Sequence, residues 1–229
     1  MKKLFVLFYA LMCLVTLQAQ KVTLQDVANG TYRAQSIQGL KPMLDGEHYT
    51  QISKDHKRIV KYSFKTGKEI ATIFDVATAR NHKLKNFDDY IMSPDESLIL
   101  IQTETKPIYR RSFTADYFVF DFKNKELKPL SEGGSQRLAT FSPTGTKVAF
   151  VRDNNIFIAD LRFGSEIQIT FDGKFNEIIN GAPDWVYEEE FGFNKAFEWA
   201  PDGSAIAFIK FDESAVKTYH MNMFRGQYP

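Results

Sequence analysis

Residues 184–191, DWVYEEEF, place three glutamates in a row behind an aspartate, a tryptophan, a valine and a tyrosine. Adjacent carboxylates repel one another, and an acidic run usually indicates a solvated face with no further role. The aromatic residues favour a second interpretation, a half-buried, shaped acidic site that is suited to holding a cation. Trp185 and Tyr187 would fix this segment against the rest of the fold, and Trp185 is expected to be buried. The solvated run remains the alternative.

The elements that would position this segment follow a repeat. Three turn sequences recur, SPDES at 93–97, SPTGT at 142–146 and APDGS at 200–204, each with proline at the second position. Proline presets the backbone angle of a turn, and the Ser, Asp and Gly residues suit the other positions. Each turn follows a short apolar piece and precedes a strand-like one, so each predicts a β-hairpin.

A second hairpin pattern recurs at 59–73, 118–130 and 156–170, where alternating apolar residues break at a turn and resume after a glutamate. Together the two patterns give four short antiparallel strands per unit. The turn motifs are 142 − 93 = 49 and 200 − 142 = 58 residues apart, slightly more than a typical propeller repeat. The sequence therefore predicts an all-β fold, a partial β-propeller of four-stranded antiparallel blades. A β-sandwich is the alternative, although it does not require the same turn at a near-fixed period.

Two insertions interrupt this repeat. The distance from the last strand of a unit to the next turn motif is 142 − 130 = 12 residues after the second unit but 200 − 170 = 30 after the third, where DWVYEEEF lies. The distance from the turn motif to the aspartate ending the third strand is 160 − 142 = 18 residues in the third unit but 121 − 93 = 28 in the second. The extra residues of the second unit, TKPIYRRSFT, contain Arg110 and Arg111.

Both insertions are predicted to project from one face. In an antiparallel blade, the turn between the second and third strands emerges at the same end as the connection that leaves the fourth strand. The arginine insertion occupies the first of these positions and the glutamate insertion the second. We therefore expect Arg110 to lie close to the glutamates, on a face where enlarged loops usually carry binding groups. The alternative for the arginines is a solvated hairpin tip.

The repeat also predicts an incomplete domain. Units run from about 41 to 73, from 90 to 130 and from 139 to 170, and a fourth unit is interrupted at Pro229. A propeller closes only with several complete blades, and open sheet edges invite association. We therefore expect residues 21–229 to form about three and a half blades of a larger propeller.

The N-terminus predicts export. Lys2 and Lys3 precede an apolar run over residues 4–17, which gives way to small and polar residues. This run is too short to span a bilayer as a stable helix, so residues 1–20 are predicted to be a cleaved signal peptide. The mature chain would then be periplasmic or extracellular. Because the lone cysteine, Cys13, leaves with the signal, neither a disulfide nor a thiol nucleophile is expected.

Charge and histidine content exclude further classes. Of the 29 basic residues two belong to the signal, which leaves 29 − 2 = 27 against 28 acidic residues. The basic residues are scattered, so neither a nucleic acid nor an anionic membrane surface is expected as the partner. The four histidines show no metal-ligand spacing, and we expect neither a metal nor another cofactor.

Three segments resemble the dipeptidyl peptidase IV family of serine exopeptidases. The run NGAPDWVYEEEFGFNKAFEWAPDGSAIAFIKFDES resembles its glutamate-motif region, and YRRSFTADYFVFDF resembles its substrate-binding arginine segment. TLQDVANGTYR resembles the family's entry into its propeller. The resemblance covers essentially all of the mature chain, and the DWVYEEE string is highly specific.

This resemblance implies an eight-bladed propeller above an α/β-hydrolase domain, in an enzyme that removes N-terminal Xaa-Pro or Xaa-Ala dipeptides from peptides with a free N-terminus. By motif position, Glu189 and Glu190 would bind the α-ammonium of the substrate. Arg110 would bind the carbonyl of its penultimate residue. Arg111 stands where relatives often differ, and no role is assigned to it. The resemblance also allows a homodimer of the full-length protein.

No G-x-S-x-G motif occurs in the 229 residues, so the nucleophile elbow of a serine hydrolase is absent from them. No catalytic residue is therefore expected in this chain, and activity would require a C-terminal α/β-hydrolase domain. The leading hypothesis is the propeller portion of a secreted dipeptidyl peptidase. A non-enzymatic propeller that binds peptides or a protein partner is the alternative, and among enzymes a relative that releases tripeptides is the nearest.

Overall fold

The computed structural model describes residues 21–34 and 39–219. The predicted signal peptide lies outside these described residues. The chain divides into two compact units, Met1–Gln38 and Gly39–Pro229, and each is described by itself.

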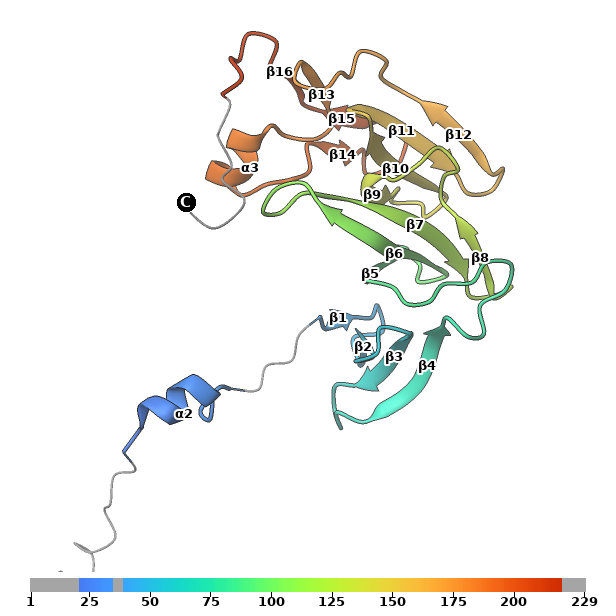
Figure 1. Cartoon of the computed structure of the whole chain (residues 1–229). Coiled ribbons are helices and arrows are strands. Elements are labelled where there is room, and N and C mark those ends of the chain that lie inside the picture. Colours follow the sequence, from blue (N-terminus) through green and yellow to red (C-terminus); the bar gives the residue numbers. More distant parts are fainter. Residues whose placement is uncertain (1–20, 35–38, 220–229) are drawn as a thin grey trace, which may run out of the picture. The chain divides into compact units, whose positions relative to one another are not determined.

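The described part of the first unit contains one short helix, α2, at Leu24–Asn29 (Figure 1). It begins with a capping box, in which the Thr23 hydroxyl accepts from the Asp26 amide and the Asp26 carboxylate accepts from the Thr23 amide. These bonds satisfy amides that a helix leaves without intrahelical partners. Over the described ranges, no helix is long and apolar enough to cross a membrane.

The second unit consists of antiparallel sheets, and three of them have four strands that pair in chain order (Figure 1). Their strands are β1 Lys41–Pro42, β2 His48–Ile52, β3 Arg58–Ser63 and β4 Glu69–Asp75; β5 Asp89–Met92, β6 Leu98–Pro107, β7 Phe113–Asp121 and β8 Glu126–Pro129; β9 Arg137–Phe141, β10 Lys147–Arg152, β11 Asn155–Asp160 and β12 Ser165–Gln168. The turn motifs at 93–97 and 142–146 connect β5 to β6 and β9 to β10. The predicted four-stranded antiparallel units are therefore confirmed.

The fourth unit differs from the expectation, because its strands form two two-stranded sheets and not one four-stranded sheet. Its strands are β13 Ile178–Asn180, β14 Phe197–Trp199, β15 Ile206–Phe208 and β16 Lys210–Asp212. β14 pairs with β15, and β13 pairs with β16. β14 and β13 therefore lie end to end along the run that β15 and β16 form.

The cause is the glutamate insertion, which we expected between units but which interrupts the first strand of the fourth unit. The Gly181 amide donates to the Ile209 carbonyl at 3.1 Å, and the Ala196 amide donates to the Gly181 carbonyl at 3.0 Å. The chain therefore leaves the sheet after Gly181 and returns at Ala196. We call residues 182–195 the glutamate excursion.

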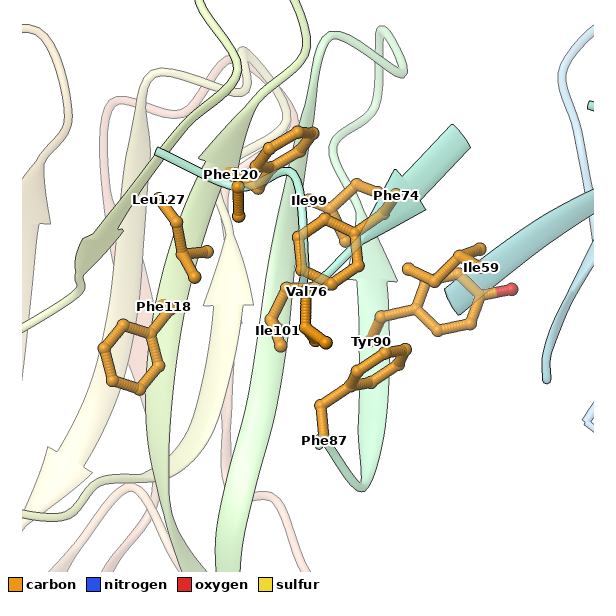
Figure 2. Packing of buried hydrophobic residues seen from close by; sticks show 11 residues of the cluster. Ile59, Phe74, Val76, Phe87, Tyr90, Ile99, Ile101, Phe118, Phe120 and Leu127 are labelled. Atoms are coloured by element: carbon orange, nitrogen blue, oxygen red, sulfur yellow. The ribbon is translucent and has the colours of Figure 1, made fainter. Parts of the chain in front are cut away.

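The sheets pack against one another through continuous apolar layers. Figure 2 shows the first layer, where Ile59 and Phe74 of the first sheet meet Ile99 and Ile101 of the second. Leu100, between those two isoleucines on β6, belongs instead to a second layer shared with the third sheet. A third layer joins the third sheet to β14.

Because both faces of β6 are buried, the sheets follow one another face to face, which is the arrangement of propeller blades. Ile99, Leu100 and Ile101 are fully buried, and each such side chain stabilises the fold by about 1.5–3 kcal/mol. The result is a rigid scaffold of stacked blades from which the two insertions extend.

Candidate functional site

The arginine insertion lengthens a hairpin. β6 has 10 residues and β7 has 9, whereas the equivalent strands of the third blade, β10 and β11, have 6 each. The pairing shifts register between Thr103 and Lys106 and then continues to Pro107, which leaves residues 108–112 as the tip. A bulge of this kind bends a strand and redirects the residues beyond it. We call residues 104–114 the arginine hairpin.

The glutamate run forms a helix, α3, at Trp185–Phe191, where we had expected a connecting loop. The Asp184 carboxylate accepts from the Tyr187 amide at 2.9 Å and caps the helix N-terminus. Gly192 ends the helix with a φ of 74°, a left-handed conformation that favours glycine. The sequence therefore carries its own start and stop signals on both sides of the three glutamates.

Tyr187 attaches α3 to the fourth blade. Its ring packs on Phe191, Phe193 and Phe211, with centroid distances of 5.1, 5.7 and 4.9 Å. Trp185, which we expected to be buried, is 50% exposed, so that prediction is wrong. On a helix the two side chains point in different directions, and Tyr187 alone faces the aromatic cluster.

The first glutamate of the run joins α3 to the arginine hairpin. Glu188 is 1% exposed, and its Oε1 atom accepts from the backbone amides of Arg111 at 2.7 Å and Ser112 at 2.9 Å. In return, Arg111 Nη1 donates to the Glu188 carbonyl at 2.9 Å. Asn194 Nδ2 donates to the Arg111 carbonyl at 3.1 Å. We call these four hydrogen bonds the clasp.

Charge stabilises the clasp as well. Burial by itself raises the pKa of the Glu188 carboxyl, but hydrogen bonds from the hairpin tip and the positive charge of Arg137 outweigh it and hold that pKa below its ordinary value. Burial lowers the pKa of Arg137, and the negative charge of Glu188 opposes this shift. Glu188 is therefore an ionised carboxylate at neutral pH.

The second glutamate meets the predicted arginine. Arg110 Nη2 lies 2.8 Å from Glu189 Oε1, with the arginine side chain 71% exposed and the glutamate side chain 23% exposed. The expectation that Arg110 lies close to the glutamates is thus confirmed for Glu189. Glu190, the third glutamate, is exposed to solvent. The site presents the Arg110 guanidinium beside the Glu189 carboxylate, and Glu190 follows on the same helix. Carboxylates can accept from a cation, and a guanidinium can donate to a neutral oxygen.

Sequence reasoning missed Glu188, Asn194 and Arg137. Helical spacing could have indicated that Glu188 and Glu189 face different surroundings, because adjacent helical residues point about 100° apart. Nothing in the sequence indicates that Asn194 reaches a carbonyl on another blade. These contacts arise only once the two insertions are folded against each other.

Comparison with known proteins identifies the family. Residues 93–229 match the family model described as the dipeptidyl peptidase IV (DPP IV) N-terminal region. The chain is 32% identical over 211 residues to the prolyl endopeptidase FAP of Homo sapiens, and this match covers 91% of this chain and 27% of that protein. It is 42% identical over 136 residues to a probable dipeptidyl-aminopeptidase B of Podospora anserina, covering 58% of this chain and 15% of that protein.

The crystal structure of dipeptidyl peptidase 4 from Porphyromonas gingivalis superposes with a TM-score of 0.82 at 41% identity. That match covers 91% of this chain and 30% of the P. gingivalis chain. The chain thus spans under a third of the length of these relatives. The family model and the close structural match together show that this chain belongs to the dipeptidyl peptidase IV family and represents its N-terminal β-propeller region.

Proposed function

We propose that this chain is the propeller part of an exported serine exopeptidase that releases N-terminal Xaa-Pro and Xaa-Ala dipeptides. The nucleophilic serine would lie in an α/β-hydrolase domain outside the 229 residues, since they contain no G-x-S-x-G motif. The likeness to the P. gingivalis dipeptidyl peptidase 4 and to a fungal dipeptidyl-aminopeptidase supports this reaction class.

In this proposal the propeller captures the end of the substrate. Glu189 and Glu190 bind the N-terminal ammonium, and Arg110 donates to the carbonyl of the penultimate residue. The observation that carries the proposal is the 2.8 Å contact between Arg110 and Glu189, because it brings donor and acceptor groups from two blades within reach of one dipeptide. A dipeptide presents an ammonium and a carbonyl only a few bonds apart, so both groups can be engaged at once.

The chemistry suits a free N-terminus. A peptide α-amino group has a pKa of about 7.7–8.0 and offers three N–H donors when protonated. Two carboxylates would keep it charged and accept charge-assisted hydrogen bonds. A blocked N-terminus cannot satisfy the pair, so the site would select chain ends.

The existing ion pair does not obstruct binding. Pairs in which one partner is largely exposed contribute only about 0–1 kcal/mol, because solvent screens them. With its side chain 71% exposed, Arg110 can leave Glu189 and turn toward a substrate carbonyl at small cost. The incoming ammonium then replaces the guanidinium as the counter-ion of Glu189.

A second candidate comes from the names of the human and mouse relatives, which are prolyl endopeptidases. An endopeptidase cleaves far from the N-terminus and gains nothing from an ammonium site. A third is a non-enzymatic peptide-binding propeller. The partly buried carboxylate of Glu189, with Glu190 next to it in the sequence, favours the exopeptidase over both.

The test is a substrate panel with the full-length protein. Three peptides share one sequence: one with Xaa-Pro at a free N-terminus, one acetylated there, and one extended by a single residue. Mass spectrometry identifies the released fragment. We expect a dipeptide from the first peptide and no cleavage of the second. Cleavage of the acetylated peptide would indicate an endopeptidase, a tripeptide from the third would indicate tripeptide release, and no cleavage at all would favour a binding module.

Export is proposed separately, from the predicted signal peptide at residues 1–20. N-terminal sequencing of the protein recovered outside the cytoplasm should begin close to Lys21. A mature protein that begins at Met1 would contradict the proposal.

A further inference from the structure

Glu188 differs from its two neighbours because it is buried in the clasp and does not face the exposed side of the site. We infer that Glu188 is a positioning residue, which holds Arg110 and Glu189 at working distance by fastening the arginine hairpin to α3, with the partly buried Arg137 as its counter-charge. The inference rests on the proposed function, because it concerns how the ammonium and carbonyl subsites are held relative to each other.

Along both segments, the proposed binding residues are next to residues of the clasp. Arg110 directly precedes the two residues, Arg111 and Ser112, whose amides bind Glu188. Glu189 directly follows Glu188. Each member of the proposed binding pair is therefore one peptide bond away from a clasp contact, and the clasp sets the distance between their backbones.

The arginine hairpin has few other contacts within the described residues. Beyond the register shift after Thr103, β6 and β7 pair with each other, and the further backbone contacts are one bridge between Ala115 and Gln136 and the Thr105 amide, which donates to the Asp88 carboxylate at 3.0 Å. The tip is closed by amides of Ile108 and Tyr109, which both donate to the Ser112 carbonyl. A two-stranded ribbon of this length is marginally stable by itself, so contacts with α3 must fix its orientation.

The burial of two polar atoms explains why the clasp uses a carboxylate. Among the described residues, Glu188 Oε2 and Arg137 Nε are both buried without a hydrogen-bond partner, which is costly for any polar atom. Opposite charges on the two side chains offset part of that cost, and each charge supports the other's ionised form. A neutral side chain at position 188 would leave Arg137 uncompensated.

The backbone near Arg137 is itself unusual. Leu138 has a φ of 62°, which costs energy for a residue with a branched side chain, and β9 shifts register against β10 at this point. Bulges often redirect a side chain next to a functional site. Here the irregularity lies directly next to Arg137 in the sequence.

The test uses the full-length enzyme and four variants, Glu188→Gln, Glu188→Ala, Arg137→Met and Asn194→Ala. We expect each to remain folded by circular dichroism and to raise KM for a dipeptidyl substrate more than it lowers kcat. A misplacement of about 1 Å can cost on the order of 100-fold in catalytic efficiency, so we expect a loss of about 10- to 100-fold for the Glu188 variants. Asn194→Ala removes one hydrogen bond and should cause a smaller loss.

A double variant, Glu188→Gln with Arg137→Met, separates positioning from simple destabilisation. Because it removes both charges together, it should be no worse than either single variant, whereas independent effects would multiply. Glu198→Gln, at an exposed glutamate of β14, is the matched control and should leave kcat/KM unchanged.

The outcomes distinguish the two proposals. If the wild-type enzyme shows no preference for a free N-terminus, the proposed function fails. If it shows that preference, but the folded Glu188 and Asn194 variants keep KM within twofold of wild type, the function stands and the positioning role is wrong. Should Glu188→Ala fail to fold, Glu188→Gln and Asn194→Ala still decide the matter.

Discussion

Arg110 and Glu189 form an ion pair of 2.8 Å between insertions on two different blades. The hairpin that carries Arg110 extends from the second blade, and the helix that carries Glu189 interrupts the first strand of the fourth. The third blade, which lies between them in the sequence, contributes Arg137, whose positive charge acts on Glu188. One compact set of charged groups is therefore assembled from three consecutive blades.

Glu189→Ala and Glu190→Ala should each lower kcat/KM for a Xaa-Pro substrate by at least roughly 30-fold. In the proposed complex the bound peptide shields each ammonium–carboxylate pair from water, and loss of one partner of such a desolvated pair costs about 2–5 kcal/mol. Steady-state kinetics measures the loss, and circular dichroism verifies the fold. Glu198→Ala, at an exposed glutamate, is the control. Folded variants within a few-fold of wild type would restore the solvated acidic run as the better account.

Arg110→Ala should cause a smaller loss than either glutamate variant. It removes a hydrogen bond between a charged donor and a neutral carbonyl, which contributes about 1.5–3 kcal/mol. Arg162→Ala is the control, because Arg162 also lies on a hairpin and pairs with a carboxylate, Asp160, at 2.8 Å. An Arg110 defect equal to that of Arg162→Ala would show that no substrate contact was lost.

Gly192→Ala should weaken the site through the backbone alone. The left-handed conformation at Gly192 costs about 1–2 kcal/mol for a residue with a Cβ atom. The nearest atom to an added Cβ is Arg111 Nη2 at 4.0 Å, so no clash occurs. Gly67→Ala is the matched control, with a φ of 64° and open space around it. We expect similar decreases in the urea midpoint, with a fall in kcat/KM for Gly192→Ala only.

The contribution of Glu188 to the free energy of unfolding should decrease as the pH is lowered. The native pKa of Glu188 lies below its unfolded value of about 4.3, so the unfolded state binds more protons between the two values. The stabilisation that ionised Glu188 gives the folded state is fully present above about pH 4.3 and is lost as the pH falls through the native pKa. The difference in urea midpoint between wild type and Glu188→Gln should therefore narrow on acidification. A difference that is constant between about pH 6 and pH 3 contradicts this assignment.

The repeat made much of the fold predictable. Proline-containing turns and alternating apolar residues are local signals, and they identify the strands of the first three blades and the hairpin of β14 and β15. The fourth blade was less predictable, because an insertion inside a strand has the same length in sequence as one between strands. Only the pairing of β13 with β16 shows which of the two has occurred.

The site was predictable in part because the repeat reveals where the two insertions are. Topology places two loops on one face, which is sufficient to bring Arg110 toward the glutamates. Backbone amides as the partners of Glu188, and the exposure of Trp185, depend on the rotation of a helix and on the register of a bulged hairpin. Neither is encoded in a local pattern, so the residues that hold the site together were missed.

The most direct test of ammonium capture compares a Xaa-Pro substrate with its desamino analogue, in wild type and in the variant Glu189→Gln with Glu190→Gln. Only the amino group differs between the substrates, and only the charge of the carboxylates differs between the enzymes. We expect wild type to prefer the amine strongly in kcat/KM, and we expect the double variant to lose most of that preference. A double variant that folds and keeps the full preference for the amine would contradict the account.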